Sequence, residues 1–164
     1  MSTVYPLDFL AKTLSGNGYQ IQKRFAIPSG GTRYFVLDLG VVSEGTCVFG
    51  FPITAGITAG HAHLDTYSCT SYTQGTALEV LPLNPKTGSN NEGIFYEATS
   101  PVGQTSLREY AIGTESTRQN AGGGFVTNDN IKILNNAPLV FEFINQDTEE
   151  IEVSFGYVWF ECLG

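Results

Sequence analysis

Apolar and polar residues alternate in short runs along most of the chain. From Gln20 onward each run has a period of two residues or is continuously apolar, and Gly, Pro, Asn or Ser residues bound it. Runs of this kind predict β-strands separated by turns. We expect strands over residues 20–26, 33–40, 46–52, 61–71, 76–82, 93–98, 106–113, 130–134, 137–145 and 150–162.

The last two runs show the clearest pattern, because alternate residues place apolar side chains on one face of each strand. These residues are Leu139, Phe141 and Phe143 in the first run, and Ile151, Val153, Phe155, Tyr157 and Trp159 in the second. Between the two runs, Asn145-Gln146-Asp147-Thr148 is a polar connection of hairpin length. These two runs are therefore the most firmly predicted strands of the chain.

The first residues differ from the rest of the chain. Leucines recur at helical spacing over residues 5–15, and Gly16-Asn17-Gly18 follows as a stop signal. We therefore expect an N-terminal arm over residues 1–18 that carries a short helix, followed by a single β-sandwich domain over residues 19–164. The apolar face of the arm packs on its own domain or lies on a neighbouring subunit, and the sequence leaves both readings open.

Antiparallel strands joined by short polar turns, without alternating helices, fit a sandwich or a jelly roll. The expected fold class is all-β, an antiparallel β-sandwich that is jelly-roll-like, with a short N-terminal helix. Three segments are expected to be loops, over residues 52–60, 84–91 and 116–128, because they are rich in Gly, Asn, Pro and Ser.

Composition and charge narrow the range of functions. The 164 residues are enough for one hydrophobic core, and 16 Asp and Glu against 8 Lys and Arg give a net charge of −8. Beyond Lys23-Arg24 the basic residues are not grouped, so we expect no nucleic-acid partner. The chain has no apolar run of about 18 residues and no signal-peptide pattern. We therefore expect synthesis in the cytoplasm, no signal peptide and no membrane partner.

The three cysteines, Cys47, Cys69 and Cys162, have neither the spacing of a zinc site nor an even number. A secreted disulfide framework is therefore not expected. Cys47 and Cys69 lie in strand-like surroundings, where a free cysteine behaves as a small hydrophobic residue. We expect reduced, buried thiols.

One short motif, His61-Ala62-His63-Leu64-Asp65, has the residue types of a metal site. On a strand, residues i, i+2 and i+4 project from one face, so that His61, His63 and Asp65 could reach one divalent ion. The motif resembles the His-x-His of cupins, although the later acidic residue and the second histidine block of that family are missing. Two other readings stay open: histidines of three subunits meeting on a threefold axis, and histidines that bond only backbone or water. We expect no other cofactor.

No nucleophile is clearly activated. The chain has no Gly-x-Ser-x-Gly motif, and Gly122-Gly123-Gly124 lacks the Lys-Ser/Thr that follows in phosphate-binding loops. A pair of Cys69 with His63 is one reading of their proximity in sequence, and chance is the other. We expect no catalytic residues and no enzymatic activity.

Paired carboxylates for glycoside hydrolysis are the remaining catalytic option. The acidic residues on predicted strands are Glu79, Glu97, Glu109 and Glu142. Each would lie on the polar face of an alternating strand, where a solvated Glu is the ordinary occupant. The carboxylates therefore indicate no hydrolase by themselves.

The C-terminal half of the chain resembles a known group of proteins in several blocks. These are residues 75–80 (GTALEV), the Asn-rich turn at 84–91, FYEA at 95–98 leading to Ser100-Pro101, NIKIL at 130–134, PLVFEFIN at 138–145, and the closing strand at 151–161. The group is the jelly-roll-type virion proteins of tailed bacteriophages, the head decoration (cement) and auxiliary structural proteins. The chain departs from it at Asn84-Pro85-Lys86, where Asn-x-Asn-Arg is typical, and in the residues after Glu161.

This resemblance implies a structural and binding role. We expect a non-enzymatic virion protein, most simply a homotrimeric decoration protein that binds the major capsid protein on the outer head surface and stabilises the shell by mass action. A β-sandwich rich in Phe and Tyr and low in charge is suited to bury aromatic area between copies of itself or against the shell. The alternative is a tail fibre or receptor-binding domain whose loops at 52–60 and 116–128 meet host surface carbohydrate. The third hypothesis is an enzyme using the metal candidates or a carboxylate pair.

Overall fold

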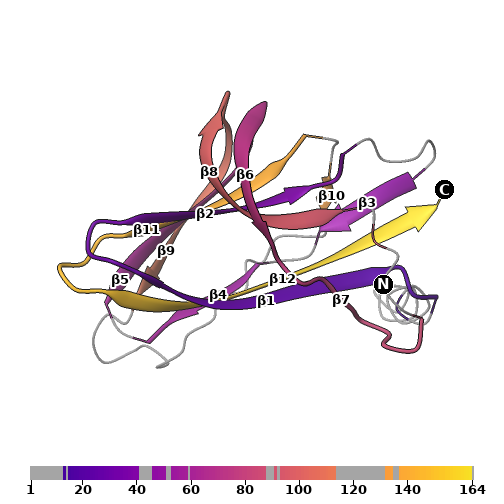
Figure 1. Ribbon diagram of the computed structural model, residues 1–164, viewed down its shortest axis with the longest axis horizontal. Helices are drawn as coiled ribbons and strands as arrows, with labels where there is room; N and C mark the ends of the chain where they lie inside the picture. The colour runs from indigo at the N-terminus through magenta and orange to yellow at the C-terminus, as the bar shows by residue number, and fades with distance from the viewer. Residues whose placement is uncertain are drawn as a thin grey trace, which may run out of the picture.

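The computed structural model describes residues 13, 15–40, 46–50, 53–58, 60–87, 91, 93–113, 132–134 and 137–163, with the backbone alone for residues 46, 47, 49, 106–113, 132–134, 162 and 163. These residues form two antiparallel sheets that pack face to face (Figure 1). The expected all-β sandwich is thereby confirmed.

The strands are β1 (Gly18–Ile27), β2 (Thr32–Asp38), β3 (Thr46–Gly50), β4 (Thr54–Ile57), β5 (His61–Ser68), β6 (Ser71–Ala77), β7 (Leu81–Pro82), β8 (Ile94–Val102), β9 (Thr105–Gly113), β10 (Lys132–Leu134), β11 (Leu139–Asn145) and β12 (Ile151–Leu163). Sheet A has the order β10-β3-β12-β1-β7, with β4 also beside β12. Sheet B has the order β6-β8-β2-β11-β5-β9.

The strand pairing follows the jelly-roll pattern. Four antiparallel pairs are nested in chain order: β1 with β12, β2 with β11, β3 with β10, and β5 with β9. Successive pairs alternate between sheet A and sheet B, as they do when one long hairpin is rolled into two layers. Strand β4 continues β3 along the same neighbour, because both pair with consecutive stretches of β12.

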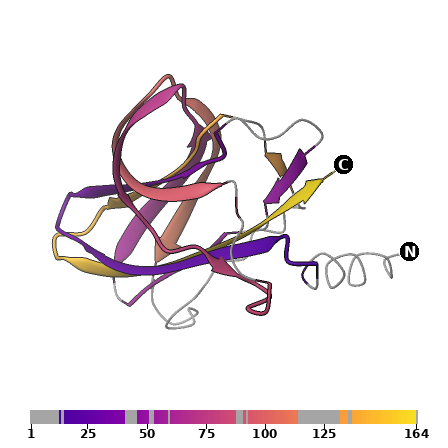
Figure 2. The ribbon, with the colours of Figure 1, turned by 45° about the vertical axis from the view of Figure 1, so that its right-hand side comes forward.

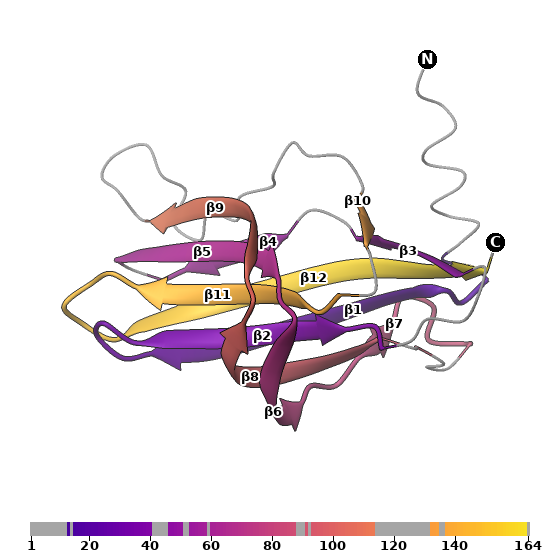
Figure 3. The same ribbon diagram turned by 90° about the horizontal axis from the view of Figure 1, so that it is seen from above.

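The antiparallel pair β6–β8 continues the pair β5–β9 beyond a corner. The continued ribbon folds over the outer face of sheet B, and β8 joins the other edge of that sheet through β2. Ser68 pairs with Thr105 before a corner, and Ser71 pairs with Val102 after it, so the two pairs form one folded ribbon. At the corner both the backbone N–H and the hydroxyl of Thr70 donate to the Val102 carbonyl, at 2.9 and 3.0 Å. Strand β8 then pairs with β2 on the far side of β11. Figures 2 and 3 show this ribbon crossing over the sheet.

Aromatic side chains fill the space between the sheets. The predicted inward faces of β11 and β12 are confirmed, since Phe141, Phe143, Phe155, Tyr157 and Trp159 are all buried in one core. The ring centroid of Phe155 lies 5.0 Å from that of Phe141 and 5.1 Å from that of Phe143. Tilted and edge-on rings at such distances are favourable beyond the area they bury.

A second, smaller core lies on the outer face of sheet B, beneath the ribbon. It consists of Val36, Tyr67, Cys69, Ala98 and Val140, against which two further tyrosines pack. Sheet B is therefore covered on both faces along its middle strands. This explains why β2 and β11 are apolar on both faces there instead of alternating.

Most of the described aromatic side chains pack in or against these two cores. Among the described residues the exposed large apolar side chains are Leu81, Ile94 and Val102, none of which is aromatic. The expectation of an aromatic surface for contacts between copies therefore finds no support in this part of the chain. Burial within one chain already removes that aromatic area from water.

Three predicted elements differ from the structure. Residues 61–71, expected as one strand, are divided between β5 and β6 by the corner at Cys69 and Thr70. Residues 52–60, expected as a loop, contain β4, because Ala55 and Ile57 alternate into the main core and the backbone pairs with β12. Residues 76–82, expected as one strand, are divided between β6 and β7, because Leu78 and Val80 turn onto the main core.

Other predictions fall wholly or mostly outside the described residues. The loop over residues 116–128 lies outside them, and so does nearly all of the helix over residues 5–15. Within the described residues no helix has the length and apolar character needed to cross a membrane.

Candidate functional site

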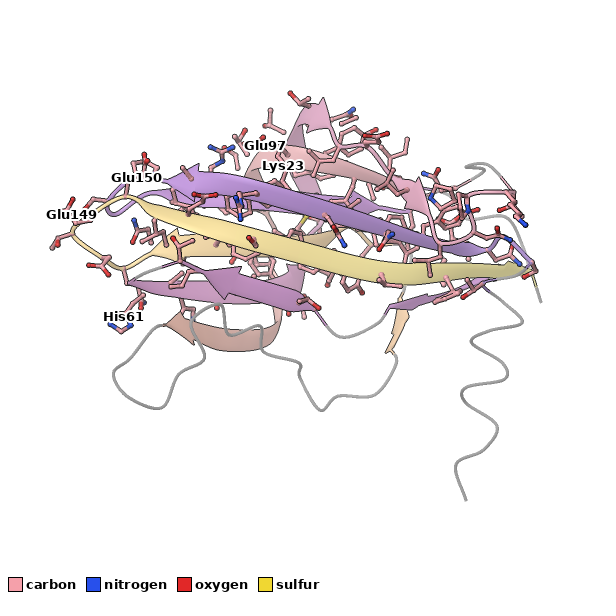
Figure 4. All side chains as sticks on the ribbon, turned by 90° about the horizontal axis from the view of Figure 1, so that it is seen from below. Lys23, His61, Glu97, Glu149 and Glu150 are labelled. Carbon is pink, nitrogen blue, oxygen red and sulfur yellow. The ribbon has the colours of Figure 1, made fainter. Side chains whose placement is uncertain are left out.

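The predicted metal candidates lie on β5 and face outward from sheet B. His61 is exposed, His63 and Asp65 are half-buried, and the residues between them are buried, as a period of two requires. Nε2 of His63 lies 3.0 Å from Oδ1 of Asp65. The backbone N–H of His61 donates to Asp147 in the turn between β11 and β12 at 3.1 Å. Figure 4 shows His61 at the same end of the molecule as Glu149 and Glu150 of that turn.

The structure thus brings two of the three candidates into contact. Among the described residues no group of three or more His, Cys, Asp or Glu side chains is arranged to hold a metal ion. His63 and Asp65 by themselves supply two ligands, fewer than a structural or catalytic zinc site uses. The metal site stays a prediction, with His61 outside the contacting pair.

The candidate carboxylates lie in different surroundings. Glu97 forms an ion pair with Arg33, Glu79 is exposed, and the side chain of Glu109 is not described. Glu142 accepts a hydrogen bond of 2.6 Å from the hydroxyl of Tyr67, and its register partner on β5 is Asp65. Glu142 therefore has a structural role beside the second core.

Tyr67 and Cys69 are held in protonated form by this environment. Burial, and then the hydrogen bond and charge of Glu142, raise the pKa of the Tyr67 hydroxyl above its ordinary value. Burial raises the pKa of the Cys69 thiol, and the Asp38 carboxylate raises it further. A reactive cysteine needs a lowered pKa, so Cys69 has the surroundings of a structural thiol, and no contact joins it to His63.

A groove runs along the outer face of sheet A, over strands β1, β12 and β4. Its volume is about 840 Å³. Figure 4 looks onto this face, with β1 and β12 running across it. Because each lining strand buries alternate residues in the main core, the intervening residues form the surface of the groove.

The register defines the shape of this β1–β12–β4 groove. Small side chains of β12, namely Ser154, Gly156 and Val158, form its floor, and their neighbours on β1 are Arg24, Gln22 and Gln20. On the other side, β4 places Gly56 beside Ser154 and Thr54 beside Gly156, and Thr58 follows. Long amides thus form one wall and threonines the other, with a low floor between them.

An ion pair closes one end of the groove. Nε of Arg24 lies 2.9 Å from Oε1 of Glu152, and both side chains are largely exposed to solvent. An exposed pair of this kind contributes little stability, typically about 0–1 kcal/mol. Its consequence here is that the charge of Arg24 is balanced at the groove's edge.

Local patterns in the sequence do not predict this groove. One signal was present, the run of small residues at alternate positions of the last strand, where Ser154 and Gly156 face outward between apolar positions. Residues 52–60 have the composition of a loop, so the sequence does not indicate that β4 lies beside β12. No protein-family model matches the chain, and no curated protein is significantly similar to it in sequence.

Proposed function

We propose that the protein is a non-enzymatic structural protein of a tailed-bacteriophage virion, a homotrimeric decoration protein that binds the major capsid protein on the outer surface of the head. The observation that carries this proposal is the nested jelly-roll pairing of β1–β12, β2–β11, β3–β10 and β5–β9. It is the architecture of the virion proteins that the C-terminal half resembles. Because a fold alone does not imply a function, the sequence blocks and the pairing support the proposal jointly.

The resembling blocks lie in the strands that build the sandwich. FYEA belongs to β8, most of PLVFEFIN to β11, and the closing block to β12. In this proposal the sandwich binds to the assembled shell as a rigid body. A protein that binds only the assembled form stabilises that form by mass action. The acidic balance of the chain favours docking on a basic surface of the shell.

The test is light scattering on the purified protein followed by co-sedimentation with undecorated phage heads. We expect a trimer that pellets with the heads at a saturable stoichiometry. A protein that remains in the supernatant at all concentrations, whatever its oligomeric state, would overturn the proposal.

The N-terminal arm is tested in the same assay by a truncation. Strand β1 begins at Gly18, and the carbonyl of Asn17 accepts a hydrogen bond from the backbone N–H of Glu161 at 2.9 Å. Deleting residues 1–12 therefore leaves these contacts in place. If the arm binds a neighbouring subunit or the shell, the truncated protein keeps its circular-dichroism spectrum and pellets less with heads. If the truncated protein binds heads as well as the full chain does, the arm is not part of the interface.

A receptor-binding domain of a tail fibre is the second candidate. It is favoured by one observation, that residues 54–58, which the hypothesis assigns to carbohydrate contacts, line the β1–β12–β4 groove. The discriminating assay is adsorption of fluorescently labelled protein to host cells. Adsorption to cells without binding to heads would replace the decoration proposal by this one.

A further inference from the structure

The two outer faces of the sandwich differ in what covers them. The outer face of sheet B carries the folded ribbon and the second core, so Val36, Tyr67 and Val140 are buried there. The outer face of sheet A has no such cover over β1, β12 and β4 within the described residues, and it is hollowed into the groove. A ligand on a sheet face therefore has its place on sheet A.

Hydrogen-bonding capacity in the groove is unused. Within the part of the chain that the structure describes, the side chains of Gln20, Gln22, Thr54, Thr58 and Ser154 make no hydrogen bond to another protein group, and most of them are exposed. An amide offers two donors and an acceptor oxygen, and a hydroxyl both donates and accepts. The two walls together thus present donors and acceptors at short intervals, which is the complement of a ligand that carries many hydroxyl groups.

Gly156 lies at the centre of the floor, and the fold does not require a glycine there. A Cβ at this position would meet its nearest atoms, the Ile21 carbonyl oxygen and Cβ of Thr54, at 3.7 and 3.9 Å, which is ordinary contact. Its φ is not in the left-handed region. A glycine inside a strand weakens the strand and often marks the close approach of a ligand or another backbone. Among the described residues, no atom other than those of its neighbouring strands lies within 4 Å of a Cβ built at Gly156.

The charge of the groove argues for an uncharged occupant. The lining contains no carboxylate, although the chain has 16 Asp and Glu. Arg24 is balanced by Glu152. Lys23 also belongs to the lining, but its register position is on the inner side of β1, opposite the buried Phe155. The floor also has only one apolar side chain, Val158, so it lacks the apolar and aromatic centre of a stable contact between subunits.

We propose that the β1–β12–β4 groove binds a neutral oligosaccharide, laid along β12 over Gly156 with its hydroxyl groups bonded to the amides of β1 and the hydroxyls of β4. This inference is independent of where the protein sits in the virion. It holds for a decoration protein that attaches to host or environmental glycans and for a receptor-binding domain alike.

The experiment is an NMR titration of isotopically labelled protein. The neutral ligands are gluco-, galacto-, manno- and xylo-hexaoses, and the anionic probe is oligogalacturonate. We expect at least one neutral hexaose to shift the amide signals of β1, β12 and β4, with an affinity that is equal at low and high salt, about 50 and 500 mM NaCl. The response of two groove variants then tests the site. Gly156→Val fills the floor, and Gln22→Ala removes an amide from the wall.

Each groove variant should lower the affinity about tenfold or more, whereas Thr73→Val, an exposed and nearly isosteric change on β6, should leave it unchanged. Circular dichroism and thermal unfolding establish that the variants are folded, and the Gln22→Ala result stands if Gly156→Val is not. The proposal is overturned if no neutral hexaose binds at up to about 10 mM. It is equally overturned by shifts confined to other strands, by unchanged affinity in folded groove variants, or by salt-sensitive binding of oligogalacturonate alone.

Discussion

Two residues of β12 differ in whether the fold explains their identity. Glu161 is buried, and its Oε1 accepts hydrogen bonds from Nε1 of Trp159 at 2.9 Å and from the backbone N–H of Gly93 at 2.8 Å. Burial of a carboxyl group is costly unless it is bonded in this way, so Glu161 serves the core. Gly156, on the opposite face of the strand, has no such structural reason.

Because the fold does not need it, Gly156 should be replaceable with a gain in stability. Alanine restricts the unfolded chain more than glycine does, so Gly156→Ala should raise the free energy of unfolding by about 0.5–1 kcal/mol. Urea denaturation measures this. The matched control is Gly75→Ala on β6, where a Cβ would clash with the Glu97 carbonyl oxygen. This variant should lose about 1–3 kcal/mol of stability. A loss of stability in Gly156→Ala would show that the fold does require this glycine.

At the scale of elements, one end of the sandwich depends on a single buried side chain that joins two connections between the sheets, the one from β1 to β2 and the one from β11 to β12. Nδ2 of Asn145 lies 3.0 Å from the carbonyl oxygen of Ile27, 3.1 Å from that of Pro28 and 2.8 Å from that of Glu149, while its Oδ1 accepts the Asp147 N–H at 2.7 Å. The turn after β1 and the turn after β11 are thereby held together. The polar connection predicted at this point is therefore also a structural junction.

Removing the Asn145 amide should loosen this junction. Asn145→Ala leaves buried backbone groups without partners, so we expect the free energy of unfolding to fall by about 2–3 kcal/mol. Gln146→Ala, an exposed change in the same turn, should alter it by less than about 0.5 kcal/mol. Both are measured by chemical denaturation, and equal effects of the two substitutions would mean that the amide does not join the two connections.

For the whole molecule, the second core couples stability to alkaline pH. Burial is the largest cause of the raised pKa values of Tyr67 and Tyr72, and their hydrogen bonds to Glu142 and Asp38 come next. Both hydroxyls stay protonated in the fold at pH values where tyrosines of the unfolded chain, with a pKa near 10, ionise. Above that pH the unfolded state binds fewer protons than the folded state, so stability is complete below about pH 10 and is lost as pH rises.

We therefore expect the free energy of unfolding to fall between pH 10 and 11 by up to about 1.4 kcal/mol for each of these two tyrosines. The Tyr67→Phe/Tyr72→Phe double variant should show a correspondingly flatter pH dependence, because it has neither hydroxyl to titrate. Urea unfolding at several pH values measures both slopes. Parallel curves for the two proteins would refute the coupling, since lysines and arginines titrate alike in both.

Local patterns in the sequence were enough to predict the fold class and much of the main core. A period of two decides which side chains of a strand share a face, and this depends only on the backbone of that strand, so the inward positions of β11 and β12 could be read directly. The same rule placed His61, His63 and Asp65 on one face. It could not say whether they meet, because side-chain contacts depend on rotamers and on neighbouring strands.

Tertiary structure decided what depends on residues distant in the chain. The groove exists because β1, β4 and β12 lie side by side, and β4 reads as a loop until its pairing with β12 is known. The second core exists because a corner near Thr70 folds the β5–β9 ribbon over sheet B, which brings Tyr72 of β6 to Asp38 of β2. Tyr67 contacts Glu142 across the neighbouring pair of β5 and β11. The sequence by itself determined the strands and their inward faces, since these follow from local periodicity. Which outer face is covered and which is open was decided only when the strands paired, because pairing is a property of contacts between segments.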